Sequence, residues 1–417
     1  MNTLSVQRTK LRLFVWLFVI SSSSYLEAKE LRPSSHNIDF APLVRQLDDI
    51  KNKHHIPAYA IVITDDNRLL VDNVRGVTHS GSQKAVSEHA YFRIGSITKN
   101  FISLATLMAE KNGKLKLTDK VTDYLGPEQF KNPFRKKHPV TIEQLLEHSA
   151  GFADMGRLEF ASNDVVSLEQ GLSRFAENRS VLWQPGQMHS YSNTSYGLAG
   201  RVLEIATKTN INDWLTQAVF KPLGMKTATM GHTELVKANL VPGYQADGVE
   251  RIPYWNMIYP SLGAINLQPR DMAKLLQFYL KRGAEILTEQ QITRLETPVT
   301  TLAAEQGLLY GYGLGIYQWY RNGRLFYGHG GDADGYLAHF GYQREINLGY
   351  FVVINTFNKQ AKQEMQRAIE SFLINSASED TPPETLEIKE QKLASLAGDY
   401  FPANTRFGRR SQTKPLR

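Results

Sequence analysis

Phe92-Arg-Ile-Gly-Ser-Ile-Thr-Lys-Asn-Phe101 is the stretch at which an extended segment of the chain gives way to a helix. Positions three apart share one face of a helix, so the amine of Lys99 can reach the hydroxyl of Ser96. A serine becomes an effective nucleophile when a neighbouring base removes its proton, and a partly buried lysine with a lowered pKa can be that base. The helix N-terminus adds N–H groups that stabilise an oxyanion. Taken alone, the four residues also fit an N-cap serine followed by a surface lysine.

The chain after this stretch, from about residue 93 to 305, is patterned mainly as helices. Apolar residues recur at helical spacing, with helix-stop signals after them, over residues 97–112, 142–148 and 196–208. We therefore predict one large, mainly helical lobe over this part of the chain.

Strand patterns lie on both sides of the helical segment. Before it, an amphipathic helix over 39–54 precedes two β-rich runs, 58–64 and 69–77. After it, β-rich runs and a last amphipathic helix cover 315–320, 325–327, 336–342, 348–355 and 359–375. These pieces are most simply joined into one antiparallel sheet. The predicted fold class is α+β: an antiparallel sheet flanked by N- and C-terminal helices, with the helical lobe inserted and a cleft where the two meet.

A second candidate element is Tyr191-Ser192-Asn193, at the end of an extended loop. Alternate residues of an extended loop point to one side, so the phenol of Tyr191 and the carboxamide of Asn193 would face the same way. A tyrosine can shuttle a proton between a serine and a leaving group, and an asparagine can orient a substrate carbonyl or the lysine. Ordinary turn chemistry explains the same residues when they are taken alone.

The third candidate element is Gly328-His329-Gly330-Gly331-Asp332, at the start of a strand near the far end of the chain. Glycines in a strand allow a ligand to approach the backbone closely, and a strand edge offers N–H groups that complete an oxyanion hole. A tight turn with a hydrogen-bonded histidine is the alternative interpretation.

These three elements, in this order and at these separations, resemble the serine β-lactamase and penicillin-binding-protein superfamily. Its class C β-lactamase-like serine hydrolases are the most similar group. The resemblance covers roughly residues 39–375 and includes three flanking stretches: Leu145-Leu-Glu-His-Ser-Ala-Gly-Phe152, Lys221-Pro-Leu-Gly-Met225 and Gly311-Tyr-Gly-Leu-Gly315. The family fold is a sheet lobe with a helical lobe and a site in the cleft, as the periodicity also predicts.

The resemblance implies a role for each matching residue. Ser96 would be the acylated nucleophile, Lys99 its activator, and Tyr191 the general base and acid. Asn193 would contact the substrate and the lysine. His329 and Gly331 would belong to the third motif, and the backbone N–H groups of Ser96 and Asp332 would form the oxyanion hole.

The third motif departs from the family pattern. Penicillin-recognising members usually have Lys-Thr-Gly there, whose ammonium and hydroxyl help to hold the substrate carboxylate, whereas this chain has His329-Gly330-Gly331. Histidine is mostly neutral at pH 7 and Gly330 has no hydroxyl, so recognition of a carboxylate is weakened. Such variants resemble family esterases and aminopeptidases as much as lactamases. Arg93 and Arg270 are the candidate substitute cations.

The sequence thus predicts a serine hydrolase that acts through an acyl-enzyme on ester or amide substrates, including β-lactams or D-amino-acid peptides. The alternative is a non-catalytic sensor or binder of peptidoglycan fragments. The expected partner is a small-molecule or peptide substrate.

Composition excludes several other classes of site. The 417 residues contain no cysteine, which removes thiol catalysis and thiolate metal sites, and the histidines lack the spacing of a metal site, so we expect no metal and no cofactor. The glycines 311, 313 and 315 lack the context of a dinucleotide loop, and Ser149 lies outside a Gly-x-Ser-x-Gly elbow. The net charge of +7 comes from basic residues at the two ends, so nucleic acid is not an expected partner.

The ends of the chain carry the remaining predictions. Residues 1–28 combine a basic leader, an apolar run over 13–20 and a candidate cut after Ala28, which is typical of an export signal. The run is too short for a bilayer that needs about 20 residues, and an uncleaved anchor or a mitochondrial transit peptide are the alternatives. We expect an exported protein, periplasmic or secreted, with no stable membrane span after signal removal. The predicted hydrolase domain is 29–376, followed by a linker over 377–390 and a basic tail or incomplete module over 391–417.

Overall fold

The computed structural model describes residues 38–377 of the chain. The predicted signal, residues 1–28, and the predicted tail, 391–417, lie outside the described residues, as does the linker beyond residue 377. Among residues 38–377, no helix is both long and apolar enough to span a bilayer.

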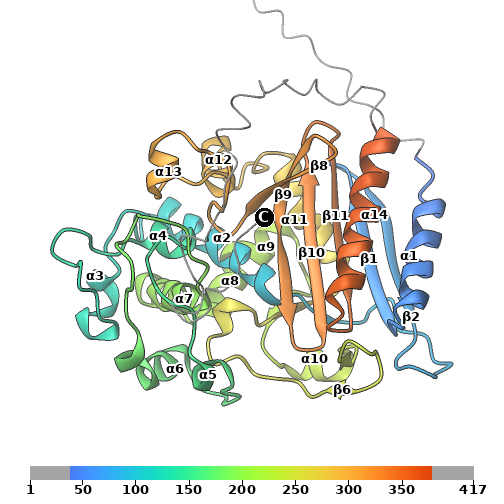
Figure 1. Ribbon diagram of the computed structural model, residues 1–417, viewed down its shortest axis with the longest axis horizontal. Helices are drawn as coiled ribbons and strands as arrows, with labels where there is room; N and C mark the ends of the chain where they lie inside the picture. Colours follow the sequence, from blue (N-terminus) through green and yellow to red (C-terminus); the bar gives the residue numbers. More distant parts are fainter. Residues whose placement is uncertain (1–37, 378–417) are drawn as a thin grey trace, which may run out of the picture. The chain divides into compact units, whose positions relative to one another are not determined.

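A six-stranded sheet in the order β2-β1-β11-β10-β9-β8 forms the first layer, and every neighbouring pair is antiparallel (Figure 1). Its strands are β1 (Ala58–Thr64), β2 (Leu69–Gly76), β8 (Tyr317–Arg321), β9 (Arg324–Ala333), β10 (Tyr336–Gln343) and β11 (Leu348–Ile354). β1, from the start of the chain, pairs with β11, from its end. The predicted α+β fold class is therefore confirmed, and the sheet unites the two ends of the domain.

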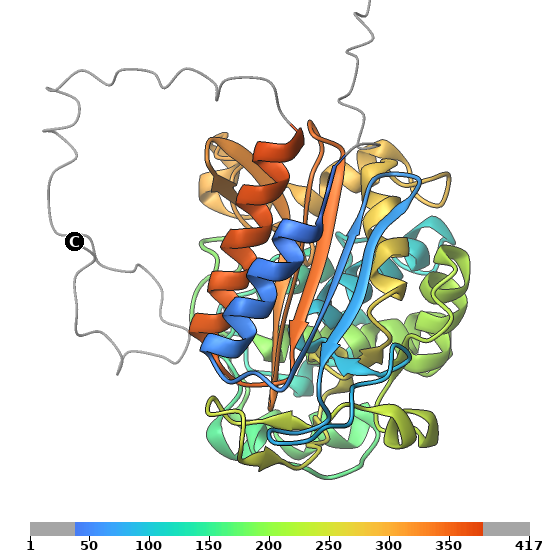
Figure 2. The same ribbon diagram turned by 90° about the vertical axis from the view of Figure 1, so that its right-hand side faces the viewer.

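The terminal helices α1 (Ala41–Lys53) and α14 (Lys359–Ala377) cover one face of the sheet (Figure 2). Alternation along β1 divides its side chains between the two faces. One set joins the core under the terminal helices, and it comprises Tyr59, Ile61 and Ile63. The other set joins the core shared with the inserted segment, and it comprises Ala58, Ala60 and Val62. Every residue of β1 is buried, because both faces of the strand are covered.

The inserted segment contains mainly helices. They are α2 (Thr98–Lys111), α3 (Thr122–Leu125), α4 (Ile142–Leu146), α5 (Arg157–Phe160), α6 (Leu168–Arg174), α7 (Asn193–Thr207), α8 (Ile211–Leu215), α9 (Lys221–Leu223), α10 (Glu234–Asn239), α11 (Asp271–Leu280), α12 (Glu289–Glu296) and α13 (Leu302–Glu305). The insert also holds a three-stranded sheet of β3 (Phe92–Arg93), β7 (Ile265–Leu267) and β4 (Thr229–Met230), and a pair of β5 (Gly243–Tyr244) and β6 (Arg251–Ile252). The strand β3 is the extended segment predicted before Ser96, whereas the other strands of two or three residues leave no readable alternation in the sequence and were not predicted.

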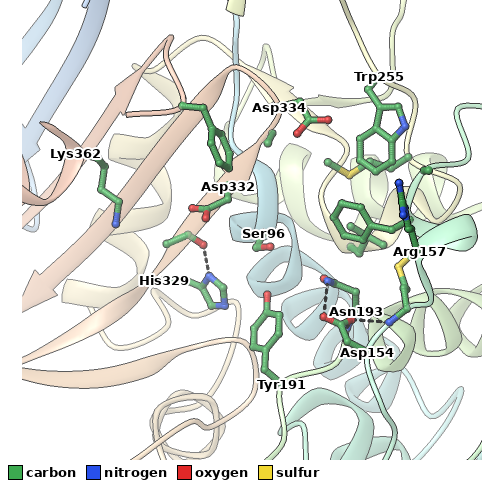
Figure 3. A pocket seen from close by; sticks show the side chains of 18 of the residues that line it. Ser96, Asp154, Arg157, Tyr191, Asn193, Trp255, His329, Asp332, Asp334 and Lys362 are labelled. Atoms are coloured by element: carbon green, nitrogen blue, oxygen red, sulfur yellow. Dashed lines mark hydrogen bonds between the residues drawn. The ribbon is translucent and has the colours of Figure 1, made fainter. Parts of the chain in front are cut away.

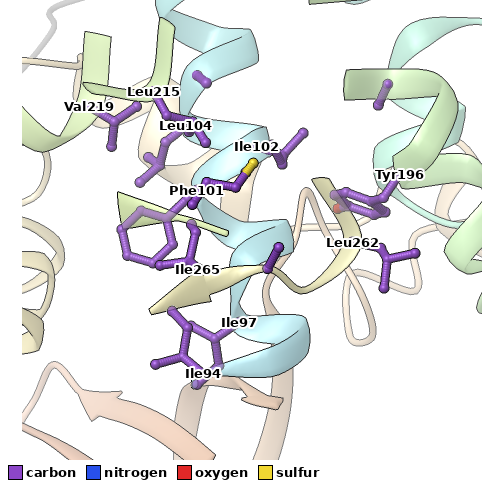
Figure 4. Packing of buried hydrophobic residues seen from close by; sticks show 14 of the residues in the cluster. Ile94, Ile97, Phe101, Ile102, Leu104, Tyr196, Leu215, Val219, Leu262 and Ile265 are labelled. Carbon is purple, nitrogen blue, oxygen red and sulfur yellow. The ribbon is translucent and has the colours of Figure 1, made fainter. Parts of the chain in front are cut away.

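Helix α2 lies at the centre of the inserted segment, and nearly all of its residues are buried. Its apolar side chains pack against α7, α8, the π-helix Thr216–Phe220 and β7 (Figure 4). Close packing in a protein interior leaves little room for movement of such an element. The segment that leads into α2, which carries Ser96, is therefore held in a fixed position against the main sheet.

Candidate active site

Ser96 lies in the short 3₁₀ helix η2 (Gly95–Ile97), between β3 and α2. Its partly exposed side chain lines a cavity of about 760 Å³ next to β9 (Figure 3). Gly95 has a φ of +53°, and a Cβ on it would lie 2.6 Å from the backbone oxygen of Asp332. Glycine at this position therefore allows η2 and β9 to approach each other closely, which brings Ser96 beside the third motif.

Lys99 is completely buried one helical turn after Ser96. Its Nζ donates hydrogen bonds to Ser96 Oγ at 3.0 Å and to the backbone oxygen of Leu262 at 2.8 Å. The aromatic rings of Tyr191 and Tyr196 lie close to the amine, with their centroids 5.2 and 5.6 Å from Nζ, respectively. The amine thus reaches the serine hydroxyl, as the helical spacing predicts, and its neutral form has the position required of a base.

Tyr191 stands in the loop before α7, and its hydroxyl points toward the Ser96 side of the cavity (Figure 3). The ring packs against that of His148, with centroids 4.1 Å apart. This contact helps to hold the ring in place. Tyr191 is therefore positioned to exchange a proton with groups bound at Ser96.

Asn193 is the first residue of α7 and also lines the cavity. Asp154 holds it: the Asn193 backbone N–H donates to Asp154 Oδ1 at 2.7 Å and its side-chain Nδ2 donates to Oδ2 at 3.3 Å. The Asn193 Oδ1 is buried and has no hydrogen-bond partner among the described residues. The orientation imposed by Asp154 therefore leaves this oxygen as an acceptor for a ligand. Sequence reasoning missed Asp154, which lies two residues beyond the 145–152 stretch.

His329 is buried at the cavity wall, where burial and then the charge of Lys99 lower its pKa to about 3. Its Nδ1 lies 2.5 Å from the backbone oxygen of Gly330, and a carbonyl only accepts, so Nδ1 carries the proton. Its Nε2 lies 2.8 Å from the hydroxyl of Tyr312, which must then be the donor. The imidazole is neutral and both nitrogens are engaged. It offers a substrate neither a cation nor a free donor.

Gly331 lies in the third motif on β9, between the cavity-lining residues Gly330 and Asp332. It is not among the residues that line the cavity, and a Cβ on it would lie 1.8 Å from the backbone oxygen of Ile94. The missing side chain makes room for the protein's own chain rather than for a ligand. We therefore assign Gly331 to packing between β9 and the segment that leads to Ser96.

Asp332 lines the cavity and lies beside Gly95. β9 and β10 are joined by a two-residue turn, so Ala333 and Tyr336 close the ladder as a hydrogen-bonded pair. Hydrogen bonding alternates along the strand, and the N–H of Asp332 therefore points away from β10. On that side β9 is paired with β8 only up to Gly328. The N–H groups of Ser96 and Asp332 are thus both available near the serine hydroxyl.

The cavity contains both signs of charge. Its carboxylates are Asp154, Asp332 and Asp334, and its cations are Arg157 and Lys362, neither of which the sequence analysis singled out. Arg93 and Arg270 do not line it. Arg93 is buried with its guanidinium against the Tyr254 ring, and Arg270 pairs with Asp72.

Apolar side chains also line the cavity, and Trp255 lies on the same side as Arg157 (Figure 3); the others are Met155, Phe160, Met257 and Leu262. The rings of Phe160 and Trp255 stack with centroids 5.4 Å apart. Within residues 38–377, no three His, Cys, Asp or Glu side chains are grouped as metal ligands would be. The arrangement suits nucleophilic attack by Ser96 on a carbonyl group.

Residues 40–373 match the model of the family described as Beta-lactamase. Among curated proteins, the chain is similar to Penicillin-binding protein 4 of Amycolatopsis lactamdurans, with 25% identity over 318 residues that cover 72% of this chain and 81% of that protein.

Two solved structures share the fold. The octameric penicillin-binding protein homologue from Pyrococcus abyssi superposes with a TM-score of 0.69 at 23% identity, over 81% of this chain and 78% of that one. The D-amino acid amidase from Ochrobactrum anthropi SV3 superposes with a TM-score of 0.68 at 20% identity, over 81% of this chain and all of that one. At these identities the two likenesses show the fold alone.

Proposed function

Because the chain belongs to the β-lactamase family, within the superfamily of serine β-lactamases and penicillin-binding proteins, we propose that it is a serine hydrolase that forms an acyl-enzyme at Ser96. The observation that carries the proposal is the 3.0 Å contact between the buried Lys99 amine and Ser96 Oγ at the wall of a substrate-sized cavity. Similarity to an amidase and to a penicillin-binding protein agrees with ester or amide bonds as the target.

In the acylation step, neutral Lys99 accepts the Ser96 proton while Oγ bonds to the substrate carbonyl carbon. The carbonyl oxygen becomes an oxyanion, which the N–H groups of Ser96 and Asp332 stabilise. Tyr191 passes a proton to the departing alcohol or amine as the carbon–leaving-group bond breaks, and Tyr191 is reprotonated from Lys99. The products of this step are the Ser96 ester and the free leaving group.

In the deacylation step, water attacks the Ser96 ester through the same oxyanion. Tyr191 relays the proton of the water to neutral Lys99, the bond between the acyl carbon and Oγ breaks, and Lys99 returns the proton to Oγ to restore the hydroxyl. His329 takes no part as a base, because the lone pair on its Nε2 accepts a hydrogen bond from the hydroxyl of Tyr312. The proposal needs no cofactor.

The test is labelling and turnover on the purified protein. A fluorophosphonate probe is expected to add its mass to the peptide that contains Ser96, and an activated ester is expected to be hydrolysed in many turnovers per molecule. Absence of both the adduct and the hydrolysis would overturn the proposal. A stable adduct without turnover would favour the alternative, a non-catalytic sensor or binder of peptidoglycan fragments.

The ranking of substrates is a second expected result. We expect kcat/KM for a short-chain p-nitrophenyl ester or a D-amino-acid amide to exceed that for a chromogenic cephalosporin. The neutral His329 makes no charge-assisted contact with a carboxylate, and such a contact is worth about 1.5–3 kcal/mol, or one to two decades of rate. A cephalosporin that is preferred by about a hundredfold would contradict the ranking, and it would direct attention to Lys362 as the cation.

We also propose export to a periplasm-like compartment or the medium, on the basis of residues 1–28. The mature protein isolated from its native cell is expected to begin near Lys29, as N-terminal sequencing would show. An intact Met1 on protein from the cytoplasm would refute this proposal.

A further inference from the structure

A chain of buried hydrogen bonds runs from the sheet to the cavity, and it begins at Glu370 on α14. This carboxylate is fully buried. It pairs with Arg321 Nε at 2.6 Å and also accepts from Tyr350 at 2.6 Å, Gln366 at 2.8 Å and Trp319 at 3.0 Å. A carboxylate paired with arginine is ionised and can only accept hydrogen bonds. The Tyr350 hydroxyl must therefore direct its proton to Glu370.

His339 on β10 continues the chain. Its Nδ1 lies 2.9 Å from the Tyr350 oxygen, whose own proton is already committed, so Nδ1–H is the donor in this contact. Burial holds the pKa of His339 well below its usual value, and the ring is neutral. A neutral imidazole with a proton on Nδ1 has a lone pair on Nε2. This nitrogen lies 3.1 Å from the hydroxyl of Tyr317, which must donate to it.

Tyr317 on β8 is the cavity end of the chain, because it lines the same cavity as Ser96. A Cβ built on Gly330 would lie 3.2 Å from the Tyr317 hydroxyl oxygen. The tyrosine hydroxyl thus stands next to the middle position of the third motif, where this chain has no side chain of its own. The Gly330 backbone N–H donates a hydrogen bond to that hydroxyl oxygen. Its proton is directed to His339 and one lone pair accepts from Gly330, so the second lone pair of the Tyr317 oxygen is the acceptor for a ligand.

We propose that Tyr317 determines substrate specificity by presenting a hydrogen-bond acceptor beside Gly330, and that Glu370, Tyr350 and His339 are positioning residues that fix this polarity. The substrate class is one that places an N–H donor, such as an amine, next to the scissile carbonyl. A carboxylate in the same place meets a lone pair and is disfavoured. Asp332 and Asp334 also line the cavity, where the Lys362 ammonium interacts with Asp332. The inference rests on the proposed function.

The test compares two amides that differ in one group: phenylalanine p-nitroanilide, as each enantiomer, and 3-phenylpropanoyl p-nitroanilide, which lacks the amine. The wild-type protein is expected to prefer the better phenylalanine enantiomer by at least about tenfold in kcat/KM. Tyr317→Phe is expected to lower this ratio by about tenfold. Tyr350→Phe, remote from the cavity, is expected to lower it at least about threefold, because the His339 proton is no longer fixed.

Tyr342→Phe is the matched control. Tyr342 lies on β10, is fully buried and donates to Glu296, so its variant loses one buried tyrosine hydroxyl as Tyr350→Phe does. Its substrate ratio is expected to equal that of the wild type. An unchanged ratio in Tyr317→Phe, with a cooperative thermal transition to show that it is folded, would overturn the inference. So would a wild-type preference for an analogue with a carboxylate in place of the amine.

The same measurements separate this inference from the proposed function. Hydrolysis that persists in Ser96→Ala would mean that the proposed function itself is wrong. Hydrolysis that depends on Ser96 but shows no effect of Tyr317 on the ratio would reject the inference and leave the proposed function in place.

Discussion

Replacing Ser96 by alanine is expected to lower kcat/KM for an activated ester by at least about a thousandfold and to abolish labelling by a fluorophosphonate probe. The hydroxyl is the group that forms the covalent bond, and the structure places it within 3.0 Å of its base and at the wall of the cavity. Cavity and oxyanion donors remain in the variant, so substrate binding should change far less than turnover. Steady-state kinetics with p-nitrophenyl acetate and a probe gel measure the two effects.

Ser173→Ala provides the control for this experiment. Ser173 is exposed on α6 and is not among the residues that line the cavity, so its loss should leave labelling and turnover unchanged. Full activity in Ser96→Ala would show that another group performs the chemistry. A loss of thermal stability in Ser96→Ala would show instead that the serine matters for folding.

Gly331→Ala is expected to reduce both stability and activity. The new Cβ would lie 1.8 Å from the backbone oxygen of Ile94 and 2.9 Å from its carbonyl carbon, and backbone atoms have no rotamer by which to move away. Overpacking of this kind typically costs about 1–3 kcal/mol, so the melting temperature should fall by about 1–4 °C. Any shift that relieves the clash moves the segment that leads to Ser96, and a displacement of about 1 Å can cost a hundredfold in rate.

Gly156→Ala is the matched control, because it adds the same methyl group where nothing lies within 4 Å. Gly156 has a φ of −67°, which alanine adopts readily. Calorimetry and ester kinetics on both variants distinguish a local clash from a general effect of adding a side chain. A Gly331→Ala protein with wild-type melting temperature and kcat would contradict the packing role.

The fold was largely predictable because its main pieces are long and periodic. Helices α1 and α14 and strands β1 and β11 have apolar residues at clear spacings, and the structure has them within about two residues of the predicted bounds. The extended segment before Ser96 was predicted and is β3, whereas the short strands β4 and β7 were missed. Their two or three residues pair with distant segments, and local sequence carries no signal for such contacts.

The site was predictable where residues lie close together in sequence. Ser96 and Lys99 are neighbours on one helical turn, so spacing alone brings them into contact. Asp154, Tyr317 and Lys362 were missed, although all three line the cavity. They belong to separate segments whose meeting depends on how the insert packs on the sheet.

The amino-acid sequence by itself determined the class of fold and the pairing of a serine with a lysine, because both depend on periodicity along one stretch of chain. Only the tertiary structure decided the state of the third motif. Burial keeps His329 neutral, and both of its ring nitrogens form hydrogen bonds, to Gly330 and Tyr312. The backbone of Ile94 lies so close to Gly331 that no side chain fits there, which makes Gly331 a packing residue. Protonation and close packing are set by groups far apart in the sequence, so they exist only once the chain has folded.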